Sequence, residues 1–198
     1  MSAVQWVLAS GNRGKLAEFA DLLAPLAVEV RPQSDWNLDS ADETGLTFVE
    51  NALIKARASS RATDLPALAD DSGLCVDALG GAPGIYSARY AGAAASDAHN
   101  NAALLQALDG VAERSARYYC CLVWIAHWQD PMPTIAWGEW RGHIAQRERG
   151  AGGFGYDPLF VSEGGLTAAE LEPAVKHRQS HRGLAARTLL EQLQRRLG

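Results

Sequence analysis

Three lysines stand out in this sequence because nearly every other basic side chain is an arginine. Of the 18 Lys and Arg residues, only Lys15, Lys55 and Lys176 are lysines. A lysine ammonium acts on phosphate as a compact point charge, whereas the arginine guanidinium is a planar fork, so the two are not equivalent at a tight polyphosphate site. The three lysines are therefore candidate contacts for an anionic ligand.

Lys15 ends the loop "SGNRGK", which follows an apolar run and precedes residues with helical spacing. Such a loop places backbone N–H groups, the positive end of a helix and the ammonium in one small volume, which is how proteins hold phosphate. The loop matches neither G-x-x-x-x-G-K-[ST] nor G-x-G-x-x-G. Taken alone, it is also compatible with an ordinary strand-to-helix turn.

Lys55 belongs to the stretch "TFVENALIKA". Thr47 and Glu50 form a T-x-x-E capping box, which predicts a helix beginning at Phe48. Asn51 and Lys55 are four residues apart and share a helix face opposite the apolar stripe. That face is either part of a binding site or a solvated polar surface.

Lys176 belongs to "VKHRQSHRG", the densest basic cluster of an acidic chain. Ser180 is a candidate N-cap for the last helix, so the cluster lies at a predicted helix start. Cations gain nothing from a helix N-terminus unless an anion also binds there. The cluster therefore favours a bound ligand.

Two pairs of adjacent carboxylates could bind a cation beside the candidate lysine contacts. Asp42 and Glu43 lie in the turn "SADETG", and Asp70 and Asp71 follow a short predicted strand, Ala67 to Ala69. Adjacent acids repel each other unless a cation or hydrogen bonds compensate. Oxygen ligands without His or Cys indicate Mg²⁺, although helix-cap or turn acids would show the same pattern.

The glycine-rich stretch "GAGGFGYDP" surrounds Phe154 and Tyr156 and precedes a predicted strand. Flexible backbone beside an aromatic ring can place that ring over a nucleobase and let main-chain groups contact the edge of the base. A plain hairpin loop is the alternative for this stretch.

The elements that must position these residues alternate between strand and helix patterns. Apolar and β-branched runs predict strands at 4–9, 67–69, 118–126, 134–140 and 156–161, and helical spacing covers 16–23, 48–56 and 186–197. Interleaved strands and helices predict an α/β fold with a mixed central sheet flanked by helices. The nearly continuous apolar run at 118–126 predicts a central strand.

Composition limits the class of protein. A chain of 198 residues with 47% hydrophobic residues predicts one domain, 1–198, and a net charge of −5 argues against a nucleic-acid partner. The chain shows no leader pattern and no apolar run long enough for a membrane span, so we expect a soluble cytoplasmic protein with no membrane partner. Cys75, Cys120 and Cys121 are expected to be buried free thiols.

Together, five stretches resemble the inosine-triphosphate pyrophosphatase family, most closely its bacterial branch. They are "SGNRGK", "ETGLTFVENALIKA", "LADDSGLCVDALGGAPGIYSARY", "GGFGYDP" and "SHRG", which occur in the family's order over almost the whole chain. The resemblance implies an elongated, two-lobed single domain with the active-site cleft between its lobes, usually a homodimer. It also implies Mg²⁺-dependent hydrolysis of the purine nucleoside triphosphates XTP, ITP and dITP to the monophosphate and pyrophosphate.

The resemblance further implies roles for individual residues. The triphosphate would be held by Ser10, Gly11, Asn12, Arg13, Gly14 and Lys15, with charge added by Lys55 and Lys176. Asp71 would accept a proton beside the metal, with Lys15 and Lys55 as further catalytic groups. Ser72 would contact substrate, and Mg²⁺ would be bound by Asp71 with Asp42 or Glu43. The base pocket would comprise Phe154, Gly155, Tyr156, Asp157, His181 and Arg182.

Small departures and two alternatives remain. Ser10 replaces the family's usual Thr, and Asp42 replaces a common Glu, so which acid at 42–43 binds the metal stays open. A Maf-type nucleotide pyrophosphatase is one alternative, against which "SHRG" and "GGFGYDP" count. A nucleotide-sensing module without turnover is the other, against which the retained acids and Lys15 count.

Overall fold

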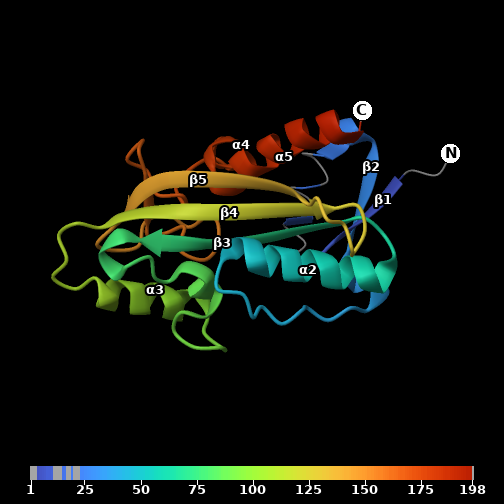
Figure 1. Cartoon of the computed structure of the whole chain (residues 1–198). Coiled ribbons are helices and arrows are strands. Elements are labelled where there is room, and N and C mark those ends of the chain that lie inside the picture. The colour runs from blue at the N-terminus through green and yellow to red at the C-terminus, as the bar shows by residue number, and fades with distance from the viewer. Residues whose placement is uncertain (1–3, 11–14, 17–18, 20–22, 198) are drawn as a thin grey trace. The chain divides into compact units, whose positions relative to one another are not determined.

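The computed structural model describes residues 4–10, 15–16, 19 and 23–197. The strands and helices are shown in Figure 1. In chain order they are β1 (Val4–Leu8), β2 (Val28–Pro32), α2 (Phe48–Thr63), β3 (Ala67–Val76), α3 (Asp97–Ala107), β4 (Ser115–Ile125), β5 (Thr134–Ile144), β6 (Phe160–Ser162), α4 (Pro173–Gln179) and α5 (His181–Leu197).

The six strands form one sheet in the order β2-β1-β3-β4-β5-β6. Strand β1 pairs in parallel with β2 and β3, whereas β5 and β6 are antiparallel. The sheet is therefore mixed and the fold is α/β, as predicted. Strand β4 lies inside the sheet between β3 and β5, which confirms the prediction of a central strand.

Contacts divide the chain into two compact units. The first comprises Met1–Asp71, Cys120–Gly138 and Ala185–Gly198, and the second comprises Ser72–Tyr119 and Glu139–Leu184. Strands β3, β4 and β5 and helix α5 each contribute residues to both units. The single domain over 1–198 stays a prediction.

The first unit has apolar residues on both faces of its strands. Successive side chains of a strand point to opposite faces, so Trp6 and Leu8 pack with Leu189 of α5, whereas Val7 packs with Ala52 of α2. Figure 1 shows α2 and α5 on opposite sides of these strands. The alternation explains why β1 is apolar at nearly every position: both of its faces are covered.

The second unit has its own core of aromatic and aliphatic side chains. Tyr118 and Phe160 have ring centroids 4.7 Å apart, and Trp140 and Phe160 have centroids 5.0 Å apart. Leu104 and Leu108, from α3 and the residue after it, pack in the same cluster. Tilted ring pairs at these separations stabilise a core beyond their buried area.

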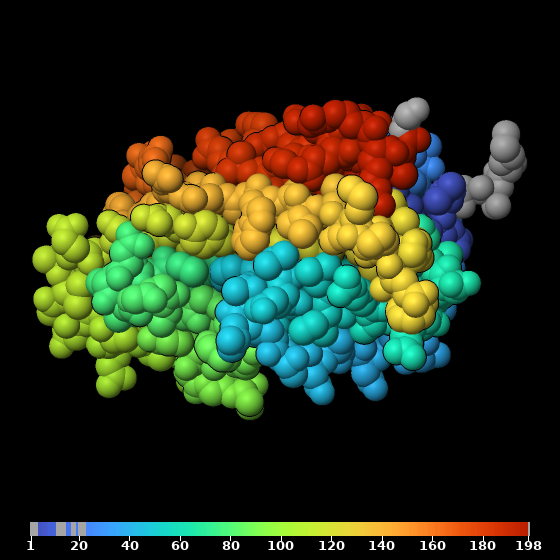
Figure 2. All heavy atoms as spheres, in the orientation of Figure 1, coloured from blue at the N-terminus to red at the C-terminus, as the bar shows by residue number. Residues whose placement is uncertain are grey.

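Helix α2 begins at Phe48, as predicted. The Thr47 hydroxyl accepts a hydrogen bond from the Glu50 N–H at 3.3 Å, and the Glu50 carboxylate accepts one from the Leu46 N–H at 2.9 Å. These bonds satisfy two N–H groups near the helix start. The outer face of α2 lies at the surface (Figure 2), where Arg57 and Arg61 are exposed.

The last helix begins after Ser180, which also confirms a prediction. The Gly183 N–H donates to Ser180 Oγ at 3.2 Å. A side chain at position 183 would overlap the carbonyl oxygen of His177, so only glycine allows α4 to approach the first turn of α5 this closely. Helix α4 itself was not predicted.

Other boundaries differ from the predictions. Strand β2 and helix α3 were not predicted, and the strand predicted at 156–161 is shorter, Phe160–Ser162. The Leu159 and Phe160 N–H groups both donate to the Tyr156 carbonyl at 2.9 Å, and Pro158 has no N–H, so 155–159 forms turns. Of the helix predicted after the first loop, the described residues Lys15, Leu16, Phe19 and Leu23 are helical.

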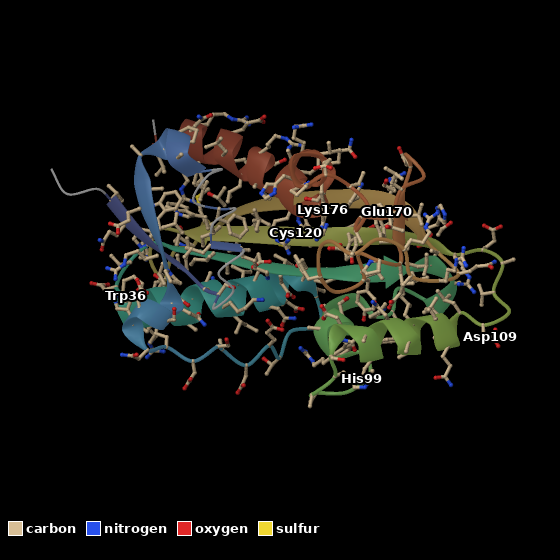
Figure 3. The ribbon with its side chains drawn as sticks, turned by 180° about the vertical axis from the view of Figure 1, so that it is seen from behind. Trp36, His99, Asp109, Cys120, Glu170 and Lys176 are labelled. Atoms are coloured by element: carbon tan, nitrogen blue, oxygen red, sulfur yellow. The ribbon has the colours of Figure 1, made fainter. Side chains whose placement is uncertain are left out.

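The three cysteines are free thiols. Cys120, labelled in Figure 3, and Cys121 are buried, whereas Cys75 is only partly buried. Burial raises the pKa of Cys121 to about 12, and the nearby Asp71 and Asp70 charges act in the same direction. Cys121 is therefore a neutral packing residue.

No helix in the described part of the chain is long and apolar enough to cross a membrane.

Leu122 of β4 provides a test of the core packing in the first unit. Leu122 is fully buried, so Leu122→Ala should lower the free energy of unfolding by about 2–5 kcal/mol, because it removes packed atoms and leaves a cavity. The matched control is Leu166→Ala at a side chain that is 47% exposed, where a much smaller change is expected. Urea unfolding of both variants measures the difference, and equal losses would contradict the assigned core.

Candidate active site

Asp70 and Asp71 lie inside β3, on opposite faces of the strand. The predicted strand ended at Ala69, and this was wrong: β3 continues to Val76. Aspartate is disfavoured in strands, but here each carboxylate meets its own lysine. The repulsion expected between adjacent acids is thus reduced by pairing on two separate faces.

Lys15 pairs with Asp70. Its Nζ donates to both carboxylate oxygens, at 3.0 and 2.7 Å, and the Asp70 side chain is only 1% exposed. A buried carboxylate needs such a charged donor because removing it from water is costly. Lys15 therefore anchors the end of the first loop to β3.

Lys55 bridges two carboxylates. From α2 its Nζ lies 2.7 Å from Glu43 Oε1 and 3.2 Å from Asp71 Oδ1. Burial lowers the pKa of Lys55, but the charges of Asp71, Asp70 and Glu43 outweigh this and raise it above its ordinary value. Lys55 is therefore an ammonium at neutral pH.

Asp71 has an environment suited to a proton acceptor. Burial raises its pKa, the Lys55 charge opposes that rise, and the Glu43 charge adds to it, leaving the pKa above the ordinary aspartate value. The second carboxylate oxygen, Oδ2, accepts a hydrogen bond from Asn51 Nδ2 at 3.2 Å. Asp71 therefore takes up a proton more readily than an exposed aspartate would.

The structure distinguishes the two acids of the first turn. Glu43 contacts Lys55, whereas the Asp42 side chain is exposed. Ser10 follows β1 and is partly buried. The predicted phosphate-binding residues Gly11, Asn12, Arg13 and Gly14 lie outside the described residues.

Glu43 and Asp71 fit a Mg²⁺ ion. Within the described ranges, no group of three or more His, Cys, Asp or Glu side chains could hold a metal unaided. Mg²⁺ is commonly bound by only one or two carboxylates, with phosphate oxygens and water completing its shell. Two ionised carboxylates around one ammonium also leave one net negative charge, which favours a cation.

In the second unit, Asp157 organises the glycine-rich loop. Its Oδ2 accepts a hydrogen bond from the Phe154 N–H at 2.8 Å and is paired with the ammonium of Lys176. Figure 3 shows Lys176 on α4. The Phe154 ring is 56% exposed, and the Lys176 ammonium lies 5.2 Å from its centroid.

His181 and Arg182 are both buried at the start of α5. The His181 ring stacks on Tyr118 at a centroid distance of 4.6 Å and an interplanar angle of 9°. Arg182 donates to Ser72 Oγ at 3.4 Å, and its guanidinium carbon lies 5.9 Å from the Phe154 centroid. Arg182 thus connects two predicted substrate-binding residues of this unit.

Tyr156 has a structural side chain. It is 4% exposed, its hydroxyl donates to the Ser87 carbonyl at 2.8 Å, and burial raises its pKa. Any contact of Tyr156 with a base would therefore involve its backbone. The neighbouring Gly155 is held through both its N–H, bonded to Asp97, and its carbonyl, bonded to Asn101.

Four residues of these networks were not predicted as site residues. Asp70 was considered with Asp71 as a possible metal-binding acid but was given no role of its own, and Asn51 was considered only as sharing a helix face with Lys55. Asp97 and Asn101 are four residues apart on α3, a helix that the sequence did not reveal. For Asp70 the period-two alternation of a strand would have been the signal, had the strand been extended past Ala69.

Comparison with known proteins agrees with this architecture. A sequence profile of the Ham1 family matches residues 6–192. A dITP/XTP pyrophosphatase of Thioalkalivibrio sulfidiphilus is 54% identical over 96% of this chain and 98% of its own length. One of Chromobacterium violaceum is 55% identical over 96% of both chains.

Solved structures show the same fold. A HAM1 protein from Coxiella burnetii has a TM-score of 0.93 at 46% identity and covers 97% of this chain and 99% of its own. The Ham1 protein of Staphylococcus aureus has a TM-score of 0.89 at 37% identity, with the same coverage. With a profile match over most of its length and relatives of this identity, the chain belongs to the Ham1 family.

Proposed function

We propose that this protein hydrolyses XTP, ITP and dITP to the nucleoside monophosphate and pyrophosphate, and so removes deaminated purines from the nucleotide pool. The observation that carries the proposal is the Lys55 ammonium held between Glu43 and Asp71. Relatives 54–56% identical over nearly the whole chain are named dITP/XTP pyrophosphatases, which supports the same reaction here. The enzyme class is a hydrolase acting on acid anhydrides.

The lysines meet the main electrostatic demand of the reaction. When water attacks the α-phosphorus, negative charge accumulates on the departing pyrophosphate, and fixed positive groups stabilise that charge. Lys15, Lys55 and Lys176 are proposed to supply it, with Ser10 and the Gly11–Gly14 backbone holding the triphosphate. The Lys15 and Lys55 carboxylate contacts keep both ammonium groups in place before substrate binds.

Mg²⁺ is the proposed metal, held by Glu43 and Asp71. When bound, it would supply positive charge to the triphosphate oxygens. Asp42 was an equal candidate from the sequence, and its exposure makes Glu43 the stronger one.

Asp71 is proposed to take the proton from the attacking water. Its raised pKa and its two fixed hydrogen-bond partners suit that role. Direct attack by water needs no covalent intermediate, so no nucleophilic side chain is required.

Selection among bases is proposed to depend on the 6-keto group. Hypoxanthine and xanthine carry this acceptor where adenine has an amino donor, so donors from His181, Arg182 or loop N–H groups would favour the former. Stacking on the exposed Phe154 ring would add affinity for any purine. Guanine shares the keto group, so its 2-amino group must be rejected by a mismatched contact.

The assembly and location are part of the proposal. We propose a homodimer, on the family resemblance described above, and light scattering of the purified protein tests it. We propose the cytoplasm as the location because the substrates are free nucleotides.

The reaction is tested by measuring pyrophosphate release from ITP, XTP, dITP, GTP and ATP, with Mg²⁺ and with EDTA. We expect release from the first three with Mg²⁺, and almost none from GTP or ATP or after chelation. Equal release from all five would refute the proposed base selectivity. Tight ITP binding without any release would favour the sensing module.

Asp71→Asn tests the proton acceptor. The change keeps the shape of the side chain but removes its basicity, so kcat for ITP should fall by about 10²–10⁴-fold while the protein stays folded. Asp109→Asn, at an exposed aspartate in the turn after α3, is the control and should leave kcat unchanged. Wild-type turnover in Asp71→Asn would exclude Asp71 as the acceptor.

Lys15→Ala tests the phosphate contact. We expect the KM for ITP to rise about tenfold or more, because a charged contact to the triphosphate is lost. The double variant Lys15→Ala/Asp70→Asn removes the partner's charge as well and so restores charge balance at a buried site. If KM is normal in the double variant, the effect of Lys15→Ala arises from Asp70 and not from substrate binding.

A further inference from the structure

Asn51 lies at the centre of the carboxylate–lysine cluster but carries no charge. It is fully buried in the first two turns of α2, four residues before Lys55. Residues at this spacing lie on the same helix face. A buried amide costs free energy unless its polar atoms are hydrogen-bonded.

Both polar atoms of the Asn51 amide have partners. Nδ2 donates to Asp71 Oδ2 at 3.2 Å, and Oδ1 accepts from the Gly45 N–H at 2.9 Å. One side chain therefore holds β3 on one side and the turn after Glu43 on the other. These partners also assign the orientation of the amide. If it were flipped, the Asn51 NH₂ group would face the Gly45 N–H, and two donors cannot form a hydrogen bond.

These bonds complete a closed ring. The Lys55 ammonium contacts Glu43 and Asp71, Asp71 accepts from Asn51, and Asn51 accepts from Gly45, two residues after Glu43. The two oxygens of Asp71 thus have different fixed donors, Lys55 on Oδ1 and Asn51 on Oδ2. This arrangement sets the rotation of the carboxylate as well as its position.

Gly45 shows how closely the turn approaches the helix. A Cβ at position 45 would lie 2.7 Å from Asn51 Oδ1 and 2.5 Å from Glu50 Cβ. Any side chain there must displace the turn that carries Glu43. The contact is therefore built by a specific pair, an asparagine on the helix and a glycine in the turn.

We propose that Asn51 is a positioning residue, whose amide fixes Glu43 and the Asp71 carboxylate relative to each other around Lys55. Its catalytic consequence rests on the proposed function, whereas the ring of hydrogen bonds does not. Groups that orient a reacting carboxylate in this way commonly change activity by about 10–100-fold when removed.

The test compares Asn51→Leu with Ser60→Ala. Leucine has a similar size and removes both hydrogen bonds. Ser60 is a buried polar residue of the same helix that donates to the Leu65 carbonyl at 2.7 Å, away from the cluster. Ser60→Ala therefore controls for losing a buried hydrogen bond of α2 without touching the ring.

For ITP hydrolysis we expect Asn51→Leu to lower kcat about 10–100-fold while KM changes less than about threefold. Ser60→Ala should keep kcat within about twofold. A general loss of stability would affect both variants alike, so a split between them is specific to the ring. Normal kcat in folded Asn51→Leu would overturn the positioning role.

A second readout does not depend on catalysis. The Gly45 amide should exchange slowly with solvent in the wild type, and at least about tenfold faster in Asn51→Leu. The Asp64 amide, which bonds to the Ser60 carbonyl at the other end of α2, is the internal reference. An unprotected Gly45 amide in the wild type would overturn the ring.

The variant Asn51→Asp tests the bond to Asp71 separately from the bond to the Gly45 N–H. It also replaces Asn51→Leu as the test if that variant does not fold. It keeps the acceptor for Gly45 but places a like charge against Asp71, so Gly45 protection should persist while kcat falls. Retained kcat would overturn the Asp71 contact. If the wild type releases no pyrophosphate yet Gly45 protection depends on Asn51, the proposed function fails and the ring stands.

Discussion

The interaction on which the site depends is the pairing of two consecutive buried aspartates with two lysines. Because β3 directs Asp70 and Asp71 to opposite faces, one ammonium cannot serve both carboxylates at close range. Lys15 supplies the charge on one face, and Lys55 supplies it on the other. Without them two carboxylates would be buried in a strand, which is costly. The same lysines that allow this strand to form are therefore those proposed to contact the triphosphate.

The elements around β3 follow from this requirement. Lys55 reaches Asp71 because α2 covers the corresponding face, and α2 begins where the Thr47 and Glu50 cap places it. That start also sets the turn carrying Glu43, through the contact between Gly45 and Asn51. In this turn Glu43 contacts Lys55, whereas Asp42 is exposed.

Sequence patterns predicted the elements whose signals are local. The capping box located the start of α2 at Phe48, Ser180 marked the start of α5, and the apolar run identified β4. The extension of β3 was missed because two aspartates end a strand by propensity, and only lysines from distant segments offset that cost. Helix α3 was missed because it lacks a clear apolar stripe, and β6 was placed too early because Pro158 and a turn precede it.

At the site, too, the sequence predicted the types of the side chains but not the strand or helix face on which each lies. Sequence could name Asp42, Glu43, Asp70 and Asp71 as acids for a cation, yet it could not say which share a face. The structure shows two groups of paired charges. Lys15 and Asp70 form a neutral pair. Glu43, Asp71 and Lys55 together leave one net negative charge when all three are ionised. This charge balance supports the proposal that a divalent cation binds at Glu43 and Asp71, because the neutral pair would offer it no net attraction. Asn51 adds no charge to this balance, so its hydrogen bonds to Asp71 and to the Gly45 N–H leave the net negative charge of the cluster unchanged.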